Sequence, residues 1–187
     1  MGSTVSDGRT ATDPFDLTGK VVIVTGSTKG LGRAMAEGLA AAGAAVVVSS
    51  RKQDLCEAVA TEIATATGAD VLGRACHVGD WDAVPEFVES VLERFGRIDA
   101  LVNNAGINPA RVRPEEMTLE FWRKVFTVNL EGPLRMSQCV FPTMRAQGKG
   151  SIVNIGTMAA YSGGGAVCAY GASKAALLNL TKSQAQE

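Results

Sequence analysis

"KVVIVTGSTKGLG", residues 20–32, decides the fold of this chain of 187 residues. A β-branched apolar run comes first, a glycine-rich turn follows, and a helical pattern begins at Leu31. The glycines fall at Gly26, Gly30 and Gly32, a GxxxGxG spacing. Backbone without Cβ atoms can turn tightly and approach an anion that the free N–H groups of a helix N-terminus bind. The stretch predicts a strand, a phosphate-binding turn and a helix; an ordinary strand-to-helix turn is the alternative.

The rest of the chain repeats this order of strand and helix. Apolar runs at 44–50, 70–78, 98–106 and 150–157 alternate with helical patterns at 31–42, 54–66, 82–95, 118–146 around Pro133, and from Ala169 onward. Strands that are apolar throughout are typical of a parallel sheet covered on both faces. We therefore expect an α/β fold, a doubly wound, Rossmann-like parallel sheet in three layers. Residues 1–16 are polar and predict a flexible tail before one domain, 17–187.

Composition excludes several classes of function. The 18 basic and 19 acidic residues give a net charge of −1, which argues against nucleic acid or a membrane surface as partner. Four cysteines without a CxxC pair and a single histidine leave no zinc ligand set, so no metal is expected. They fit a reducing, cytoplasmic compartment. The most apolar run, residues 39–48, is too short to cross a bilayer.

The end of the second expected strand, "VVVSSRK" at residues 46–52, bears on which nucleotide is bound. A site for NAD usually offers an acidic residue there, to accept hydrogen bonds from the ribose hydroxyls. Here Ser50 takes that place and Arg51 follows. A guanidinium can bind a 2′-phosphate through two charge-assisted hydrogen bonds, and Lys29 adds a second positive charge. The pattern favours NADP over NAD; the alternative is that Arg51 and Lys52 form a solvated charged loop.

Four motifs in this order resemble the short-chain dehydrogenase/reductase family. They are "TGSTKGLG" at 25–32, "NNAG" at 103–106, Asn129 in "TVNLEG", and "YGASK" at 170–174. The resemblance runs from about residue 18 to residue 187. With the glycine turn, it implies that the cofactor is bound by Gly26, Ser27, Lys29, Gly30, Leu31, Gly32, Ser50, Arg51, His77, Val78, Asn103, Ala105, Gly106, Tyr170 and Lys174.

The resemblance also implies a set of catalytic residues. Tyr170 and Lys174 are four residues apart and share one face of a helix. An ammonium beside a phenol favours the phenolate, so Tyr170 can act as general acid in reduction and as general base in oxidation. Lys174 is expected to bind the nicotinamide ribose, and Asn129 to support a water-mediated proton path to Lys174. By itself, a YxxxK pair is common on helix surfaces.

The chain departs from the family pattern at several positions. Thr157 replaces the usual serine; it keeps the hydroxyl that would bind the substrate oxygen but restricts χ1. If it merely ends a strand, the site is weakened. Neighbouring Gly156 replaces another common serine. His77 stands where many members carry an aspartate at the adenine, and the backbone of Val78 would still contact the base. The chain also ends before the usual last strands, which predicts a fragment or a truncated form.

These observations predict an NADP-dependent oxidoreductase that interconverts a carbonyl compound and an alcohol. The alternative is a relative that binds NADP(H) without catalysis. In the family, the helices around Pro133 and from Ala169 commonly pack against another subunit, so a homodimer or homotetramer is expected. "CVFPTM" and "AALLNL" offer apolar faces for that contact, but they fit the core equally well.

Overall fold

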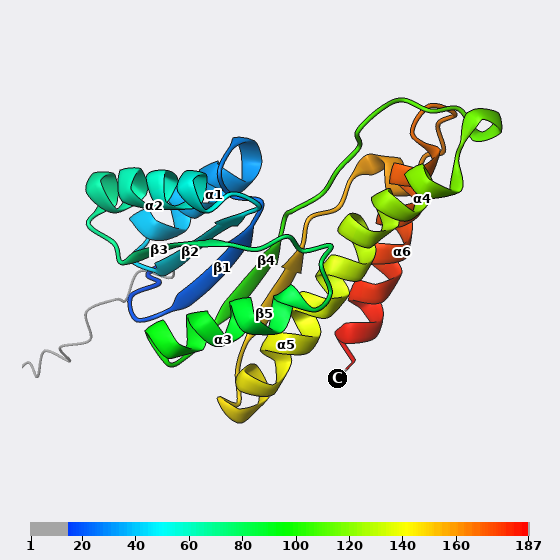
Figure 1. Ribbon diagram of the computed structural model, residues 1–187. Coiled ribbons are helices and arrows are strands. Elements are labelled where there is room, and N and C mark those ends of the chain that lie inside the picture. Colours follow the sequence, from blue (N-terminus) through cyan, green and yellow to red (C-terminus); the bar gives the residue numbers. More distant parts are fainter. Residues whose placement is uncertain (1–14, 187) are drawn as a thin grey trace, which may run out of the picture.

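The computed structural model describes residues 15–186 and contains one five-stranded sheet (Figure 1). All strands are parallel and lie in the order β3-β2-β1-β4-β5. Their bounds are β1 Val21–Thr25, β2 Ala45–Ser50, β3 Val71–Ala75, β4 Ala100–Asn103 and β5 Ser151–Asn154. The prediction of a doubly wound parallel sheet is confirmed. Residues 1–14 of the predicted tail lie outside the described residues.

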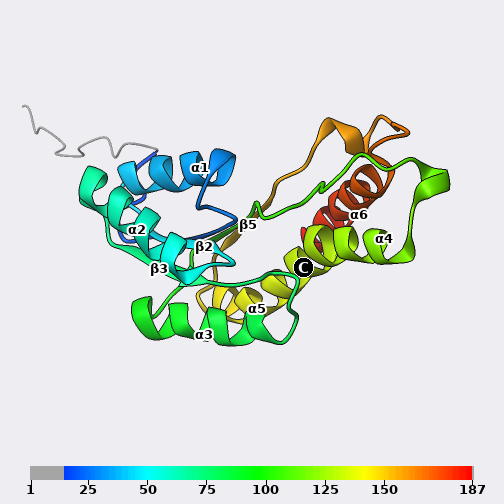
Figure 2. The ribbon, with the colours of Figure 1, turned by 45° about the horizontal axis from the view of Figure 1, so that its top comes forward.

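The described part contains six α-helices, of which the first five lie between strands and α6 follows β5. They are α1 Gly30–Ala41, α2 Gln53–Thr67, α3 Ala83–Phe95, α4 Leu119–Phe126, α5 Gly132–Ala146 and α6 Cys168–Gln184. Helices α1 and α2 cover one face of the sheet and α3 and α5 the other, while α4 and α6 lie beyond β5 (Figures 1 and 2). None of these helices is long and apolar enough to cross a membrane. The three-layer arrangement arises because right-handed crossovers that run in opposite directions along the sheet place their helices on opposite faces.

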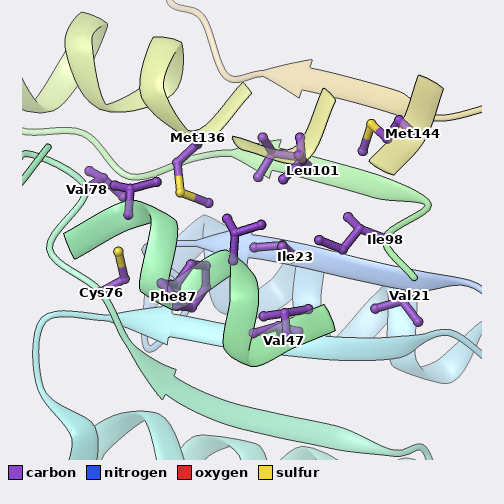
Figure 3. Close-up of a cluster of buried hydrophobic side chains, with 14 residues drawn as sticks. Val21, Ile23, Val47, Cys76, Val78, Phe87, Ile98, Leu101, Met136 and Met144 are labelled. Carbon is purple, nitrogen blue, oxygen red and sulfur yellow. The ribbon is translucent and has the colours of Figure 1, made fainter. Parts of the chain in front are cut away.

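The centre of the sheet explains why the apolar runs form strands. Val21–Val24 in β1 are at most 4% exposed, because helices cover both sides of this strand. On one side, α3 and α5 pack against alternate strand residues, among them Ile23, Val47 and Leu101 (Figure 3). On the other side, α1 and α2 pack against the intervening valines. The two clusters hold the carboxyl end of β1 in place.

The predicted helix 118–146 is one continuous helical segment with a change of winding inside it. Helix α4 leads into a π-helical turn, η2 (Thr127–Glu131), and α5 follows. Pro133 is the second residue of α5 and comes directly after the π-helical turn. The turn inserts an extra residue per winding and directs Asn129 into the interior, where it is fully buried.

The order of the strands fixes where a ligand can bind. The connection after β1 leads to β2 on one side, while β4 lies on the other side of β1, so the winding direction reverses between β1 and β4. Ligands of such sheets bind outside the carboxyl ends of the strands at this reversal. The glycine turn follows β1 and the "NNAG" motif begins in β4, so both lie at that point.

Candidate nucleotide and catalytic site

The three glycines of the turn meet different steric demands. Gly26 has φ +65°, and a Cβ on it would lie 2.9 Å from Ala105 Cα. A Cβ on Gly32 would overlap the carbonyl oxygen of Gly26 and Asn104 Nδ2. Gly30 has φ +57° and faces open space, so only its backbone conformation requires glycine. The turn is therefore packed closely against the segment after β4, and Cβ atoms at Gly26 and Gly32 would push the two apart.

Hydrogen bonds attach this turn to β4. Asn104 Nδ2 donates to the carbonyl oxygens of Thr25 (2.9 Å) and Gly26 (3.1 Å). In return, the Thr25 hydroxyl accepts from the backbone N–H groups of Asn104 and Ala105, each at 3.1 Å. Thr25 and Asn104 were absent from the predicted set. Neighbouring residues of an extended segment face opposite sides, and this alternation could have indicated that Asn104, next to the buried Asn103, faces the glycine turn.

Two predicted cofactor residues of this region use their side chains within the protein. Ser27 is fully buried; its hydroxyl donates to the Val24 carbonyl (2.6 Å) and accepts from Ser49 N–H (2.9 Å). Asn103 is 1% exposed, and its Nδ2 donates to Asn154 Oδ1 at 2.9 Å. Both residues hold the strand ends together beneath the site. A direct contact of either side chain with a cofactor stays a prediction that their positions do not favour.

A cavity of about 420 Å³ opens at the carboxyl ends of β1, β4 and β5. The structure brings together here four predicted residues, Leu31, Gly106, Tyr170 and Lys174. Asn104, Ile107, Asn108, Ile155 and Gly156 complete the lining. Segments that are far apart in the sequence thus converge on one space: the start of α1, the stretch after β4, the stretch after β5 and the first turns of α6.

Lys174 is the most buried charged group of the site. It is 3% exposed, and its Nζ donates to the backbone carbonyl of Ile155 at 2.7 Å. Burial lowers the pKa of its ammonium from the ordinary value of 10.5. Among residues 15–186, no carboxylate forms an ion pair with it. A buried, incompletely bonded ammonium at a cavity wall is available to bind hydroxyl groups of a ligand.

We expect Lys174→Met to raise the melting temperature at pH 7, because it removes a buried charge and keeps the apolar volume. The unfolded chain holds this proton up to about pH 10.5, whereas the folded protein loses it at lower pH. Between these two pKa values the unfolded state binds more protons, so this group makes stability rise with pH. The advantage of the variant should therefore shrink as the pH approaches 10.5.

Melting curves of wild type, Lys174→Met and Lys182→Met across this pH range check the prediction. Lys182 lies in the same helix and is exposed, so its replacement should leave the melting temperature nearly unchanged. Equal effects of the two substitutions, or a lower melting temperature of Lys174→Met at pH 7, would show that burial of the Lys174 charge does not cost stability.

Asn129 is anchored on three sides in the π-helical turn. Its Oδ1 accepts from Ile107 N–H (2.7 Å), and its Nδ2 donates to the Ile107 carbonyl (2.9 Å) and to Ser173 Oγ (3.1 Å). These bonds fix the orientation of the amide and connect it to the segment after β4 and to α6. Ser173 was not among the predicted residues, since a serine within a helix carries no signal until its partner is known.

The two remaining catalytic candidates flank the cavity differently. Tyr170 lines it and is half-buried, and no described residue forms a hydrogen bond with its hydroxyl. Thr157 lies beside the lining residue Gly156, three residues after β5 ends, and begins the short helix η3 (Met158–Ala160). Its Oγ1 accepts from Ala159 N–H at 3.3 Å, which leaves the hydroxyl proton free. Thr157 therefore caps a helix and does not end the strand.

The far end of the expected nucleotide site lies at β2 and β3. Arg51 and Lys29 are exposed, and neither forms an ion pair within residues 15–186. Ser50 is half-buried at the end of β2, and its carbonyl accepts from Cys76 N–H, so the ends of β2 and β3 are adjacent. His77 is exposed with its Nδ1 accepting from Gly79 N–H (3.0 Å), and Val78 is buried. These residues line up along the sheet edge beyond the glycine turn.

Comparison with known proteins agrees with this geometry. A family model described as short chain dehydrogenase matches residues 20–187. The chain belongs to this family. A relative, "Dehydrogenase/reductase SDR family member 4" of Homo sapiens, is 42% identical over 120 residues, which are 64% of this chain and 43% of that protein. The chain thus spans less than half the length of this relative of the short-chain dehydrogenase family.

Two solved structures of other proteins share the fold. A metagenomic short-chain oxidoreductase in complex with NADP superposes with a TM-score of 0.86 at 36% identity, covering 91% of this chain and 77% of that chain. NAD⁺-bound xylitol dehydrogenase gives a TM-score of 0.86 at 32% identity, covering 90% of this chain and 65% of that chain. Similar folds therefore hold either nicotinamide nucleotide, so the fold alone does not decide between NAD and NADP.

Proposed function

We propose that this protein is an NADP-dependent oxidoreductase that interconverts a carbonyl compound and a secondary alcohol. The observation that carries the proposal is the convergence of Tyr170 and Lys174 on one cavity with the glycine turn. The turn at Gly26 and Gly32 can pack against the segment after β4 only because Cβ atoms are absent, and a pyrophosphate would lie on this turn at the start of α1. Leu31, Gly106 and Lys174 then hold the nicotinamide half within the cavity, next to Tyr170.

Each residue has a defined role in this chemistry. A bound nicotinamide supplies or accepts the hydride. Tyr170 gives its proton to the substrate oxygen during reduction and removes it during oxidation. The Thr157 hydroxyl, oriented by Ala159 N–H, donates to the same oxygen as charge develops on it. Lys174 binds the ribose and favours the phenolate of Tyr170, while Asn129 supports the water-mediated proton path to Lys174.

The preference for NADP rests on the charges at the end of β2. Ser50 brings no carboxylate that would repel a 2′-phosphate, and the exposed Arg51 and Lys29 lie free of carboxylate partners among the described residues. A guanidinium binds phosphate through two parallel hydrogen bonds, and each charge-assisted bond contributes about 1.5–3 kcal/mol. The exposed His77 and the backbone of Val78 complete the proposed nucleotide-binding surface, while the buried Ser27 supports the turn from within the protein.

A fluorescence titration with NADPH and with NADH tests this preference. We expect Arg51→Ala to weaken NADPH binding about 10- to 100-fold, the equivalent of one charge-assisted bond, and to leave NADH binding unchanged. Lys52→Ala is the matched control, because it removes the same charge from the next, also exposed residue. Equal losses of NADPH affinity in both variants would show that the effect comes from net charge and not from a specific contact of Arg51. Tighter binding of NADH than of NADPH would overturn the preference.

Three further properties belong to the same proposal. A homodimer or homotetramer would form through α5 and α6; Phe141 of α5 is 37% exposed, which supports an apolar contact at this helix. The small-molecule substrate would enter the cavity beside Tyr170. A cytoplasmic location is supported by the four cysteines, all of which are free thiols.

A further inference from the structure

We propose that Ser173 is a positioning residue, which links the side chain of Asn129 to the backbone of Tyr170; this inference rests on the proposed function. Ser173 is completely buried in α6, between the two residues of the YxxxK pair that face the cavity. Its hydroxyl forms two hydrogen bonds with different parts of the molecule. It donates to the carbonyl oxygen of Tyr170 at 2.8 Å and accepts from Asn129 Nδ2 at 3.1 Å.

A buried serine in a helix commonly donates to a carbonyl one turn earlier, and this bond alone would be only structural. Ser137 in α5 shows that ordinary case: it is 3% exposed, and its hydroxyl donates to the Pro133 carbonyl at 2.7 Å. No other described group forms a hydrogen bond with the Ser137 hydroxyl. Ser173 differs because its hydroxyl has a second partner. A lone pair of Ser173 Oγ accepts from Asn129 Nδ2.

The second bond matters because Asn129 has no other acceptor for that N–H. Its Nδ2 carries two protons; one goes to the Ile107 carbonyl and the other to Ser173 Oγ. Without the hydroxyl, a completely buried N–H would lose its partner, and the amide would turn to find another. Asn129 Oδ1, which accepts from Ile107 N–H, would then move as well.

The displacement would reach the cavity directly. A Cβ on Gly106, which lines the cavity, would lie 3.4 Å from Asn129 Oδ1 and 3.6 Å from Lys174 Nζ, so both side chains come close to this glycine. The chain of bonds from Ile107 through Asn129 and Ser173 to Tyr170 thus ties the cavity floor to the backbone of the proposed proton donor. Displacements of less than an ångström at such groups lower the rate of chemistry more than they weaken binding.

The test compares Ser173→Ala with Ser137→Ala, which removes the same back-bonding hydroxyl without the second partner. NADPH-dependent reduction of cyclohexanone, acetophenone, benzaldehyde and 2,3-butanedione is followed in both variants and wild type, and NADPH affinity is measured by fluorescence. We expect Ser173→Ala to lower kcat about tenfold and to change KM and the NADPH Kd less than about twofold. Ser137→Ala should keep the wild-type kcat. Adding Ser173→Ala to Asn129→Ala should cause no further loss of kcat, because both substitutions remove the same hydrogen bond between these two side chains.

A kcat of Ser173→Ala equal to that of Ser137→Ala would overturn the inference and leave the proposed function intact. The same conclusion would follow if the losses of kcat caused by Ser173→Ala and Asn129→Ala multiplied in the double variant. If Ser173→Ala does not fold by circular dichroism, Ser173→Cys replaces it: the thiol is a weak acceptor of nearly the same size, and an intermediate kcat is expected. Unchanged kcat in Ser173→Cys would overturn the inference. Wild-type protein that binds NADPH but reduces none of the four carbonyl compounds would overturn the proposed function and the inference with it.

Discussion

Tyr170→Phe is expected to lower the rate of carbonyl reduction by about 10²- to 10⁴-fold, the usual contribution of a positioned general acid. The substitution removes one oxygen from a half-buried side chain, and that oxygen forms no hydrogen bond with residues 15–186, so the fold should not change. NADPH binding should stay within about twofold of wild type, because the phenol donates mainly to the reacting oxygen. Steady-state kinetics and a fluorescence titration of the same preparation give both numbers.

The chain offers a matched control for this experiment. It contains two tyrosines, and the other, Tyr161, is 71% exposed outside the cavity that holds Tyr170. Tyr161→Phe should keep both turnover and binding. Loss of turnover in Tyr161→Phe alone, or full activity of Tyr170→Phe, would contradict the role of Tyr170 as proton donor.

Gly32→Ala is expected to destabilise the fold by about 3 kcal/mol and to abolish NADPH binding, the second large effect. The new methyl group would overlap the Gly26 carbonyl oxygen and Asn104 Nδ2, and no rotamer can move a methyl group away. Forcing extra volume into a packed site typically costs about 1–3 kcal/mol, and backbone on one side leaves little room for relaxation. Any relief must displace the glycine turn itself, the surface on which the pyrophosphate is proposed to lie.

Gly38→Ala in the same helix is the control with the opposite expected sign. Gly38 is exposed, and nothing lies within 4 Å of a Cβ built on it. Alanine there should stabilise the helix by about 0.5–1 kcal/mol, because it reduces the freedom of the unfolded chain. Urea unfolding of both variants measures the two effects. Similar stability of Gly32→Ala and Gly38→Ala would show that the turn is not packed as described.

Much of the fold follows from the sequence, because the spacing of apolar residues agrees with the burial of the elements that they form. The run Val21–Val24 has no polar face, so it must lie in a sheet covered on both sides, as β1 does. The strand ends were predicted less well: the third run was expected to reach residue 78, but β3 ends at Ala75. The chain leaves the sheet there, where Gly79 N–H donates to the His77 ring and Asp80 N–H to its carbonyl. Apolar residues, Cys76 and Val78, continue past the end of β3, so hydrophobicity alone does not indicate the turn.

The site was predictable where a motif fixes a residue and not where a tertiary partner does. Tyr170, Lys174, Gly106 and Leu31 meet at the cavity as their spacing and order suggest. Asn103 and Asn104 are the same residue type, and only the side to which each side chain points decides that Asn104 binds the glycine turn. The π-helical turn around Asn129 is also invisible in "TVNLEG", since the extra residue in its winding arises from contacts with Ile107 and α6.

The most direct test of the central claim is a turnover measurement with the wild-type protein. NADPH and a panel of ketones and aldehydes are mixed with the protein, nicotinamide absorbance is followed, and the alcohol formed is quantified. We predict continuous oxidation of NADPH with one alcohol formed per nucleotide oxidised, and no such reaction in Tyr170→Phe. Tight NADPH binding without any oxidation across the panel would contradict the account, and would make the protein a nucleotide-binding module without catalysis.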